Sequence, residues 1–554
     1  MYKQLLIVPI LFLSLTAGSP ARLNAQENHP QGWGFQFVPG TLVVSRSVYQ
    51  GKTSTVTIGE PLPLGCQGGL TGLTINVPTT TGGATPVTVP CGVATDNGEY
   101  PNLFDTHNVW NNANSDGSFG VTSPIFLDDI TTDGWTLGTL PIPTDQIVTS
   151  FSSKSELALN RSVDGRSITF MGYVGGIGCG GSTVSPTAPN LLDVSNSNTP
   201  GVCDPTNPVI STFPSDPVIP AAYYRAVAEV DPDGRLSITD GNAYSGDNGR
   251  AAFKGGNGLY YMAGNDNNGN LSKKQIPITQ AGIDLVNATG AELLYPGQTP
   301  PVPPNIEMIG RLQYGTDKPG KDTNFRGLTI FHNTLYVTKG SGSNGINTVY
   351  QAGTPGTLPT GSAADLATVP LTILPGFPNT PASTTTAFPF GIWFADPNTL
   401  YVCDEGDGVM VSPPVNGNVA DAQSLATAGL QKWRLIDGTW VLQYILQDGL
   451  KIGVPYNVNW YPSSLNPATG GCRNIEGIHN FDGTVTIFAI TSTISPNGDT
   501  GADPNQLVKV TDRVSDTTLP SGEGYLGHFF IIRSAKAGEV LRGVTLAPGG
   551  FNGW

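Results

Sequence analysis

The sequence predicts an all-β fold and, within that class, a β-propeller. One phrase recurs along the chain: a small-residue strand with an early arginine, a tight polar turn, and a β-branched or aromatic strand. Sustained helical periodicity is absent beyond the N-terminal apolar run, so little helix is expected. Near each end of the chain lies one strand pattern that lacks the partner strand found in the other copies. The copies are Asn160–Tyr173, Gly249–Gly264, Phe325–Gly340, Phe390–Asp404 and Arg473–Ala489, with a truncated copy at Leu541–Pro548.

Each copy supplies the first two strands, A and B, of a four-stranded blade A to D. Asp-Gly and Asp-Pro-Asn turns between alternating apolar residues are strong hairpin signals. The clearest blade has strands at Phe390–Ala395, Thr399–Asp404, Leu430–Ile436 and Thr439–Ile445. Two other blades are expected at Leu157–Val163, Arg166–Tyr173, Tyr223–Val230 and Leu236–Thr239, and at Asn474–His479, Thr484–Thr491, Gln506–Thr511 and Gly527–Ile532.

The two ends of the chain complement each other. Leu541–Pro548 reads as an A strand with nothing after it, and Thr41–Gln50 reads as a B strand with no A strand before it. Pro124–Ile130 and Trp135–Pro141 can serve as its C and D strands. Pairing the termini in one blade would close the ring and remove exposed sheet edges. The prediction is six blades, with seven as the alternative if Ile306–Tyr314 belongs to a further blade.

The N-terminus predicts export. Lys3 precedes an apolar stretch from Leu5 to Ala17, and a small-residue site follows at Ala25. This pattern is typical of a signal peptide. A membrane anchor is the alternative, but the stretch is shorter than the ~20 residues that span a bilayer. The expected location is extracellular, with the periplasm or the cell surface as alternatives.

Length and charge set further expectations. The 554 residues divide into a signal peptide at 1–25, an extension at 26–40, one propeller at 41–548 and a tail at 549–554. Long insertions at 51–123, 174–222, 405–429 and 447–471 are expected on one face of the propeller, where binding loops usually lie. The formal charge of −15 disfavours nucleic-acid and anionic-membrane partners. A monomer is expected.

Six cysteines in an exported chain suggest disulfides. Sequence alone allows 15 connectivities for six cysteines. The proposed pairs are local ones: Cys66 with Cys91, Cys179 with Cys203, and Cys403 with Cys472. Each of the first two would close one Gly/Pro-rich insertion. The third would join the end of one B strand to the start of the next A strand.

Arginines at the starts of A strands suggest a binding site at the mouth of the central channel. Guanidinium groups bind carboxylate, phosphate or sulfate through paired hydrogen bonds. The alternative is structural, because such arginines can also hold loop carbonyls or carboxylates between blades. The residues are Arg161, Arg250, Arg326, Arg473 and Arg542.

Two acidic motifs raise the question of catalysis. Glu476 lies in an Asn-x-Glu-Gly phrase, and its roles are either chemical or structural within the channel. Asp404, Glu405 and Asp407 form a short cluster that could hold calcium, although the segment is shorter than an EF-hand loop. A plain Gly-rich turn is the alternative there. No other cofactor is expected.

The chain resembles a family of secreted, mostly bacterial β-propeller proteins without assigned function. The resemblance spans Thr41 to Pro548 and rests on phrases such as FRGLTIFHNTLYVTKGSGSNG, LYVCDEGDG and LRGVTLAP. It implies architecture and little chemistry. The phrase around Glu476 is also similar to that of phytase-like and lactonase-like propellers, where such a carboxylate binds a divalent cation or takes part in hydrolysis.

Three functions therefore stand as hypotheses. The first is binding of an anionic small molecule or acidic glycan at the arginine-lined mouth. The second is a metal-assisted hydrolase or lyase that acts on a phosphoester, lactone or uronate at the same face. The third is a structural or adhesion module. The fold itself does not decide among them.

Overall fold

A computed structural model describes most of the expected propeller. The described residues are 34–48, 122–144, 146–151, 156–174, 225–241, 249–264, 325–340, 345–361, 365–366, 368–380, 387–461, 463–495, 501, 503–522 and 525–550, together with strands at 61–62, 72–78, 84–90, 92–96, 110–112, 283–287, 306–309 and 311–312. The expected signal peptide at 1–25 and the four cysteines of the two other proposed disulfides (Cys66, Cys91, Cys179 and Cys203) lie outside them. Among the described residues no helix is long and apolar enough to cross a membrane.

The chain is all-β with a β-propeller arrangement. In the part that the structure describes, five sheets each contain four consecutive antiparallel strands. The sheet that contains both ends of the chain has the order β34 (Glu539–Leu546), β1 (Leu42–Val48), β8 (Ile125–Ile130) and β9 (Thr136–Pro141). β1 pairs with β34 from Leu42 opposite Leu546 to Val48 opposite Glu539, with a register shift between Ser45 and Arg46.

The other four uninterrupted sheets follow the chain in order. Two of them are β15 (Gly249–Lys254), β16 (Leu259–Gly264), β17 (Ile283–Asn287) and β18 (Ile306–Ile309), then β20 (Phe325–Phe331), β21 (Thr334–Lys339), β22 (Thr348–Ala352) and β23 (Pro370–Ile373). The next two are β24 (Pro389–Asp396), β25 (Thr399–Asp404), β28 (Gly429–Ile436) and β29 (Thr439–Leu446), then β30 (Ala468–His479), β31 (Thr484–Ile494), β32 (Gln506–Arg513) and β33 (Phe530–Ser534).

One further sheet has a divided first strand. Its centre is β12 (Ile168–Val174), followed by β13 (Arg225–Val230) and β14 (Leu236–Gly241). β11 (Asn160–Arg161) pairs with one end of β12, and β10 (Ile147–Ser150) pairs with the other. The strand expected at 157–163 is therefore only two residues long, and Leu157, the first residue of the expected range, has a left-handed φ of 60°.

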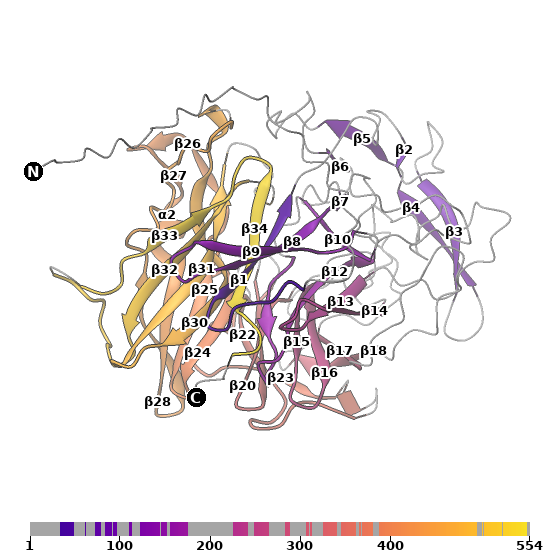
Figure 1. Ribbon diagram of the computed structural model, residues 1–554, viewed down its shortest axis with the longest axis horizontal. Helices are drawn as coiled ribbons and strands as arrows, with labels where there is room; N and C mark the ends of the chain where they lie inside the picture. Colours follow the sequence, from indigo (N-terminus) through magenta and orange to yellow (C-terminus); the bar gives the residue numbers. More distant parts are fainter. Residues whose placement is uncertain are drawn as a thin grey trace, which may run out of the picture. The chain divides into compact units, whose positions relative to one another are not determined.

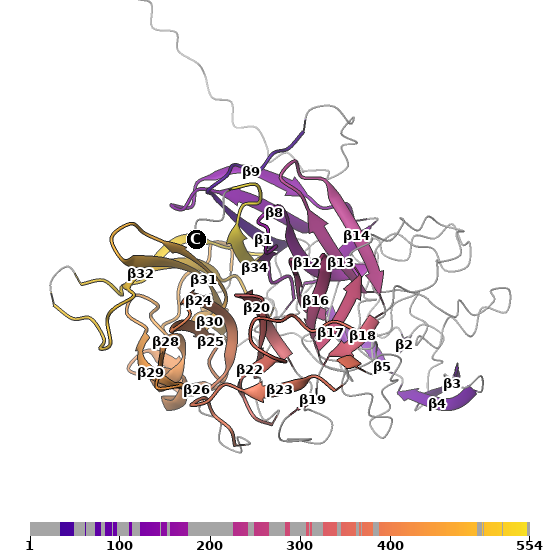
Figure 2. The same cartoon turned by 90° about the horizontal axis from the view of Figure 1, so that it is seen from below.

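The segment Ile306–Tyr314 is shared between two sheets. β18 pairs with β17, whereas β19 (Arg311–Leu312) runs parallel to β23 of the following sheet. The last D strand also differs from expectation, because β33 starts at Phe530 rather than at Gly527. Figure 2 shows the inner strands β20, β24, β30 and β34 near the middle and the outer strands β9, β14 and β29 near the rim.

The core lies between neighbouring sheets. One apolar cluster, for example, joins Tyr401 and Cys403 of β25 to Ile475 of β30 and Val485 of β31. Burial of such side chains contributes roughly 1.5–3 kcal/mol each. The inner strands are buried at nearly every position, so both sides of each sheet pack against protein at this radius.

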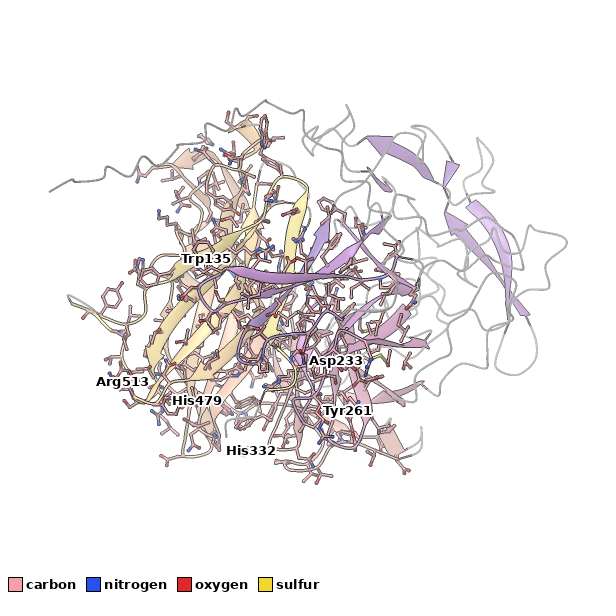
Figure 3. The ribbon with its side chains drawn as sticks, in the orientation of Figure 1. Trp135, Asp233, Tyr261, His332, His479 and Arg513 are labelled. Carbon is pink, nitrogen blue, oxygen red and sulfur yellow. A yellow bond between two sulfur atoms is a disulfide. The ribbon has the colours of Figure 1, made fainter. Side chains whose placement is uncertain are left out.

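The two ends of the sheets differ. The end with the tight β20–β21 turn at His332–Asn333 is here called the turn face, and the opposite end the loop face. Figure 3 shows His332, His479 and Arg513 along the lower side of the view, at the turn face. On the loop face, the described insertions after β25 and β29 pack together, with Val419 N–H donating to Gly453 O at 2.8 Å. They carry β26 (Met410–Val415), β27 (Asn418–Ala420), the short helix α2 (Ala422–Thr427) and η5 (Ser463–Leu465) (Figure 1).

Long connections are not confined to the loop face. The segments between β22 and β23 (353–369) and between β32 and β33 (514–529) join C to D strands and therefore begin at the turn face. Long connections at the turn face were not among the insertions expected from the sequence, which were placed on one face only.

Candidate functional site

The inner strands approach one another through small residues. A cavity of about 10 Å³ on their axis is lined at one level by Ala158, Ala251, Gly327, Gly391 and Asn474. A Cβ atom on Gly327 would lie 2.4 Å from Phe390 O, so only glycine permits this approach. A volume of about 10 Å³ is near the minimum for a single water. At this level the axis is therefore packed and offers no open channel.

Four of the five predicted arginines occupy equivalent positions. Arg250, Arg326 and Arg473 each precede one of the cavity-lining residues, and Arg542 precedes Gly543, which packs against Leu157 in the same way. All four are at the loop-face end of the cavity and are only 2–5% exposed. The repeated phrase thus places these side chains as the sequence predicts, but buries them.

Three of these arginines bridge neighbouring strands and sheets. Arg250 Nη1 donates to Phe325 O at 2.5 Å. Arg326 Nε donates to Gly340 O at 2.6 Å, and its guanidinium lies 5.9 Å from the centre of the Phe390 ring. Arg542 donates to Ser47 Oγ at 3.3 Å and to the carbonyl of Phe151. These contacts satisfy backbone carbonyls where sheets meet, which is a structural use of the guanidinium.

Arg473 has a carboxylate partner. Its Nε atom donates to Glu405 Oε2 at 3.0 Å, and both side chains are buried. The pair lies beside the disulfide between Cys403 and Cys472, whose Cα atoms are 5.2 Å apart. This disulfide joins β25 to β30 as predicted. The charge of Arg473 is therefore already compensated within the protein.

Arg161 lies at the other end of the inner strands. It is three residues beyond Ala158 and pairs with Ile168, the first residue of β12. Its Nε atom donates to Gly165 O at 3.2 Å, and Nη2 donates to Gly550 O. Arg161, which the sequence groups with Arg250, Arg326 and Arg542, is therefore out of register with them, whereas Arg473, which the sequence places slightly offset, is in register.

The environment of Arg161 is distinctive. The side chain is half-buried, and burial lowers its pKa despite the opposing influence of Glu476 and Asp164. Two of the five N–H groups of a guanidinium are used in the bonds above. Within the described part of the chain, no carboxylate lies within ion-pair distance of Arg161. This guanidinium thus has donors and charge available at the turn face.

Glu476 of β30 forms hydrogen bonds to β34 of the neighbouring sheet. Its Oε1 atom accepts the N–H of Gly477 at 2.9 Å, and Oε2 accepts Thr545 Oγ1–H at 2.7 Å and the N–H of Leu546 at 3.3 Å. Burial raises the pKa of Glu476, although these hydrogen bonds and the charge of Arg161 oppose the shift. The structure thus brings together Glu476 and Arg161, and separates both from the loop-face arginines.

The Asn-x-Glu-Gly phrase has a packing explanation. Asn474 and Glu476 both accept hydrogen bonds from β34. Gly477 lies against the ring of Trp393, to which a Cβ atom would come within 2.4 Å. Trp393 also contacts His479, with ring centres 5.5 Å apart. The sequence did not predict the contact between Trp393 and His479, and the glycine after Glu476 is its one local signal.

The three acidic residues of the Asp404–Asp407 segment serve separate partners. Asp404 accepts the N–H groups of Phe388 and Gly406, both at 2.9 Å. Glu405 pairs with Arg473, and Asp407 accepts Ser424 Oγ–H at 2.7 Å. No group of three metal-binding side chains is present among the described residues. Each of the three acidic side chains therefore already has a protein partner, and the calcium site stays a prediction.

Comparisons with known proteins identify neither a family nor an activity for this chain. No family model matches the chain, and no curated protein matches it. Similar solved structures include a β-xylosidase at 12% identity and a TM-score of 0.26, covering 60% of this chain and 85% of that one. An apocarotenoid oxygenase/RPE65 chimera (9%, TM-score 0.22) and a Synechocystis apocarotenoid oxygenase mutant (10%, TM-score 0.20) each cover 86% of this chain, which spans 64% of theirs. At these TM-scores, none of them bears on the activity of this chain.

Proposed function

We propose that this propeller binds an anionic small molecule or an acidic glycan, and that Arg161 at the turn face is the anchoring residue. The observation that carries the proposal is the half-buried guanidinium with unused N–H groups and no ion-pair partner among the described residues. Arg250, Arg326, Arg473 and Arg542 act in this proposal as connectors between sheets.

Partial burial makes Arg161 a better anion site than a surface arginine. An anion bound there would restore the favourable charge interaction that burial removes, and would be screened less by salt than one at an exposed residue. Carboxylate and phosphate both match the planar geometry of the guanidinium. The neighbouring carboxylate of Glu476 would disfavour highly charged ligands and favour a monoanionic group such as a uronate.

The test is calorimetric titration of the full chain with glucuronate, an oligogalacturonate and inorganic phosphate. Arg161→Gln should weaken binding of the best anion by about tenfold or more, because charge-assisted hydrogen bonds are lost. Arg166→Gln is the matched control, since Arg166 lies in the same turn but is exposed. If no anion binds the wild type, or if both variants bind alike, the site is not at Arg161.

A hydrolase or lyase is the second candidate because the pKa of Glu476 is raised, a property of many proton donors. Activity on phosphoesters, lactones and uronates would be measured with and without a chelator. Loss of turnover in Glu476→Gln with unchanged anion binding would support the enzyme, and inactivity of the wild type on every substrate would reject it. A chain that neither binds nor turns over any of these compounds fits a structural or adhesion module.

We also propose six blades, closed by the strands from the two termini. The pairing of β1 with β34 supports closure, and the sheet built on β12 supports a sixth blade despite its divided first strand. The division of Ile306–Tyr314 between two other sheets weighs against a seventh. An experimental structure that shows the blades directly would test the count.

Export remains a proposal of the same kind. The disulfide between Cys403 and Cys472 supports it, because such bonds persist mainly in oxidising compartments. N-terminal sequencing of the mature protein tests it, with a start at Gln26 as the expected result.

A further inference from the structure

A loop on the loop face presents one tryptophan almost entirely to solvent. The loop 456–467, apart from Pro462, is described, and its ends are joined by Tyr456 N–H donating to Pro467 O at 2.9 Å. Within it, Trp460 is 91% exposed. A compact loop with closed ends is a frequent carrier of function.

Trp460 occupies a backbone position that disfavours tryptophan. Tyr461 N–H donates to Val458 O at 3.1 Å, so Val458 to Tyr461 form a tight turn. Trp460 is its third residue and has a φ of 68°. A positive φ at that position calls for glycine or asparagine, and a bulky aromatic residue there is an outlier. Neither burial nor backbone preference therefore explains why the chain has tryptophan here.

Hydrogen bonds fix the loop 456–467 on both sides of Trp460. Tyr461 Oη–H donates to Asp503 Oδ1 at 2.6 Å, and both side chains are buried. Tyr456 Oη–H donates to Pro504 O at 2.8 Å. Asn466 Nδ2 donates to Asn457 Oδ1 at 2.8 Å across the loop. Because the loop is held on both sides of Trp460, little backbone freedom is lost when a ligand binds there.

The surroundings of the ring are polar and uncharged. Asn457, Asn459, Ser463 and Ser464 are exposed, and residues 452–467 contain no charged side chain. Protein-binding hot spots lie in well-packed, desolvated pockets, whereas this ring projects from a polar loop and is 91% exposed. A flat aromatic face beside amides and hydroxyls matches a sugar ring instead, whose C–H face is apolar and whose edge carries hydroxyls.

From this geometry we propose that Trp460 is a stacking platform for a neutral saccharide, with Asn457 and Asn459 as hydrogen-bonding partners. The site is on the loop face and does not depend on Arg161. Its ligand also differs, because no cation lies in the loop to attract an acidic sugar. The chain would then carry two saccharide- or anion-binding regions at opposite ends of its sheets.

The test titrates the full chain with cellohexaose, xylohexaose, mannohexaose and maltohexaose, followed by calorimetry and tryptophan fluorescence. Trp460→Ala and Trp460→Gly should weaken binding of the best ligand by about tenfold or more, since stacked aromatic contact is lost. Trp135→Ala is the control, because Trp135 is 77% exposed in the β8–β9 turn and has no positive φ. It should bind like the wild type.

Thermal melting supplies a second readout. Trp460→Gly should keep or raise the melting temperature, because glycine accepts the left-handed backbone and no packing is lost. Loss of saccharide binding together with an unchanged or higher melting temperature supports a functional tryptophan. Absence of binding to all four sugars, equal binding by Trp460→Gly, or a marked fall in its melting temperature would overturn the proposal.

Discussion

The side chain of Asn474 substitutes for a missing strand partner of Val544. Asn474 Oδ1 on β30 accepts the backbone N–H of Val544 on β34 at 2.6 Å, and both residues are buried. β34 is the first strand of its sheet, so its free edge would otherwise leave this N–H without a partner. A buried polar group must be satisfied in some way, and here one amide joins the last sheet in sequence to the sheet containing both ends of the chain.

Asn474→Ala should lower the free energy of unfolding by about 1–3 kcal/mol, because the N–H of Val544 loses its acceptor in a buried place. Urea denaturation measures the change. Asn459→Ala, at an exposed asparagine, should have no effect. Equal stability of the two variants would show that water reaches Val544.

Asp404 should make stability fall as pH rises. Burial raises its pKa to about 7, well above the value in an unfolded chain. The folded state therefore favours the protonated form, so the contribution of Asp404 is complete below about pH 4 and is lost as pH rises through about 7. The full span amounts to at most about 4 kcal/mol.

Comparison with Asp404→Asn isolates this contribution, because asparagine does not titrate. Melting temperatures of both proteins would be followed from about pH 5 to about pH 8. The wild type should lose stability relative to the variant across this range. A constant difference between them would mean that Asp404 is ionised throughout.

Removal of the disulfide between Cys403 and Cys472 should lower the free energy of unfolding. Cys403 and Cys472 are 69 residues apart, and in the chain-entropy account a loop of that length is worth about 4 kcal/mol. Cys403→Ala combined with Cys472→Ala should show a loss of that order by denaturation. Peptide mapping without reduction checks that the bond exists in the wild type. Unlinked peptides would contradict the structure.

Two lysine–aspartate pairs offer a matched comparison. Lys432 and Asp512 are fully buried at 2.9 Å, and burial lowers the pKa of Lys432. Lys432→Met should cost about 3–5 kcal/mol, because it leaves Asp512 charged and unpaired in the core. Lys509 and Asp133 form a partly exposed pair at 2.5 Å, so Lys509→Met should cost less than about 1 kcal/mol. Similar losses in the two variants would refute this contrast.

Local signals predicted the strands well. Around the Asp-Pro-Asn turn, strands expected at 390–395 and 399–404 are observed at Pro389–Asp396 and Thr399–Asp404. Turn chemistry and alternation act within a few residues, so one sequence suffices to locate such hairpins. The pairing of Cys403 with Cys472 was also predictable, because the repeat places them close together on neighbouring strands, Cys403 near the end of β25 and Cys472 in the first half of β30.

Features that depend on contacts between sheets were not predictable. Arg161 matches the repeat by residue type, but Ala158 is the residue that aligns with the other cavity-lining positions. The left-handed backbone of Leu157 and the docking of Gly550 on Arg161 have no local signature. The contact of Trp393 with Gly477 likewise joins residues that are far apart in the sequence.

The strand β1 begins at Leu42, whereas its partner β34 begins only at Glu539. During translation, β1 leaves the ribosome long before the residues that cover its edge exist. Until then a nascent chain offers that edge to other strands, which favours delayed folding or chaperone protection. Products of premature termination would lack β34, would keep the exposed edge, and should be prone to aggregation and degradation.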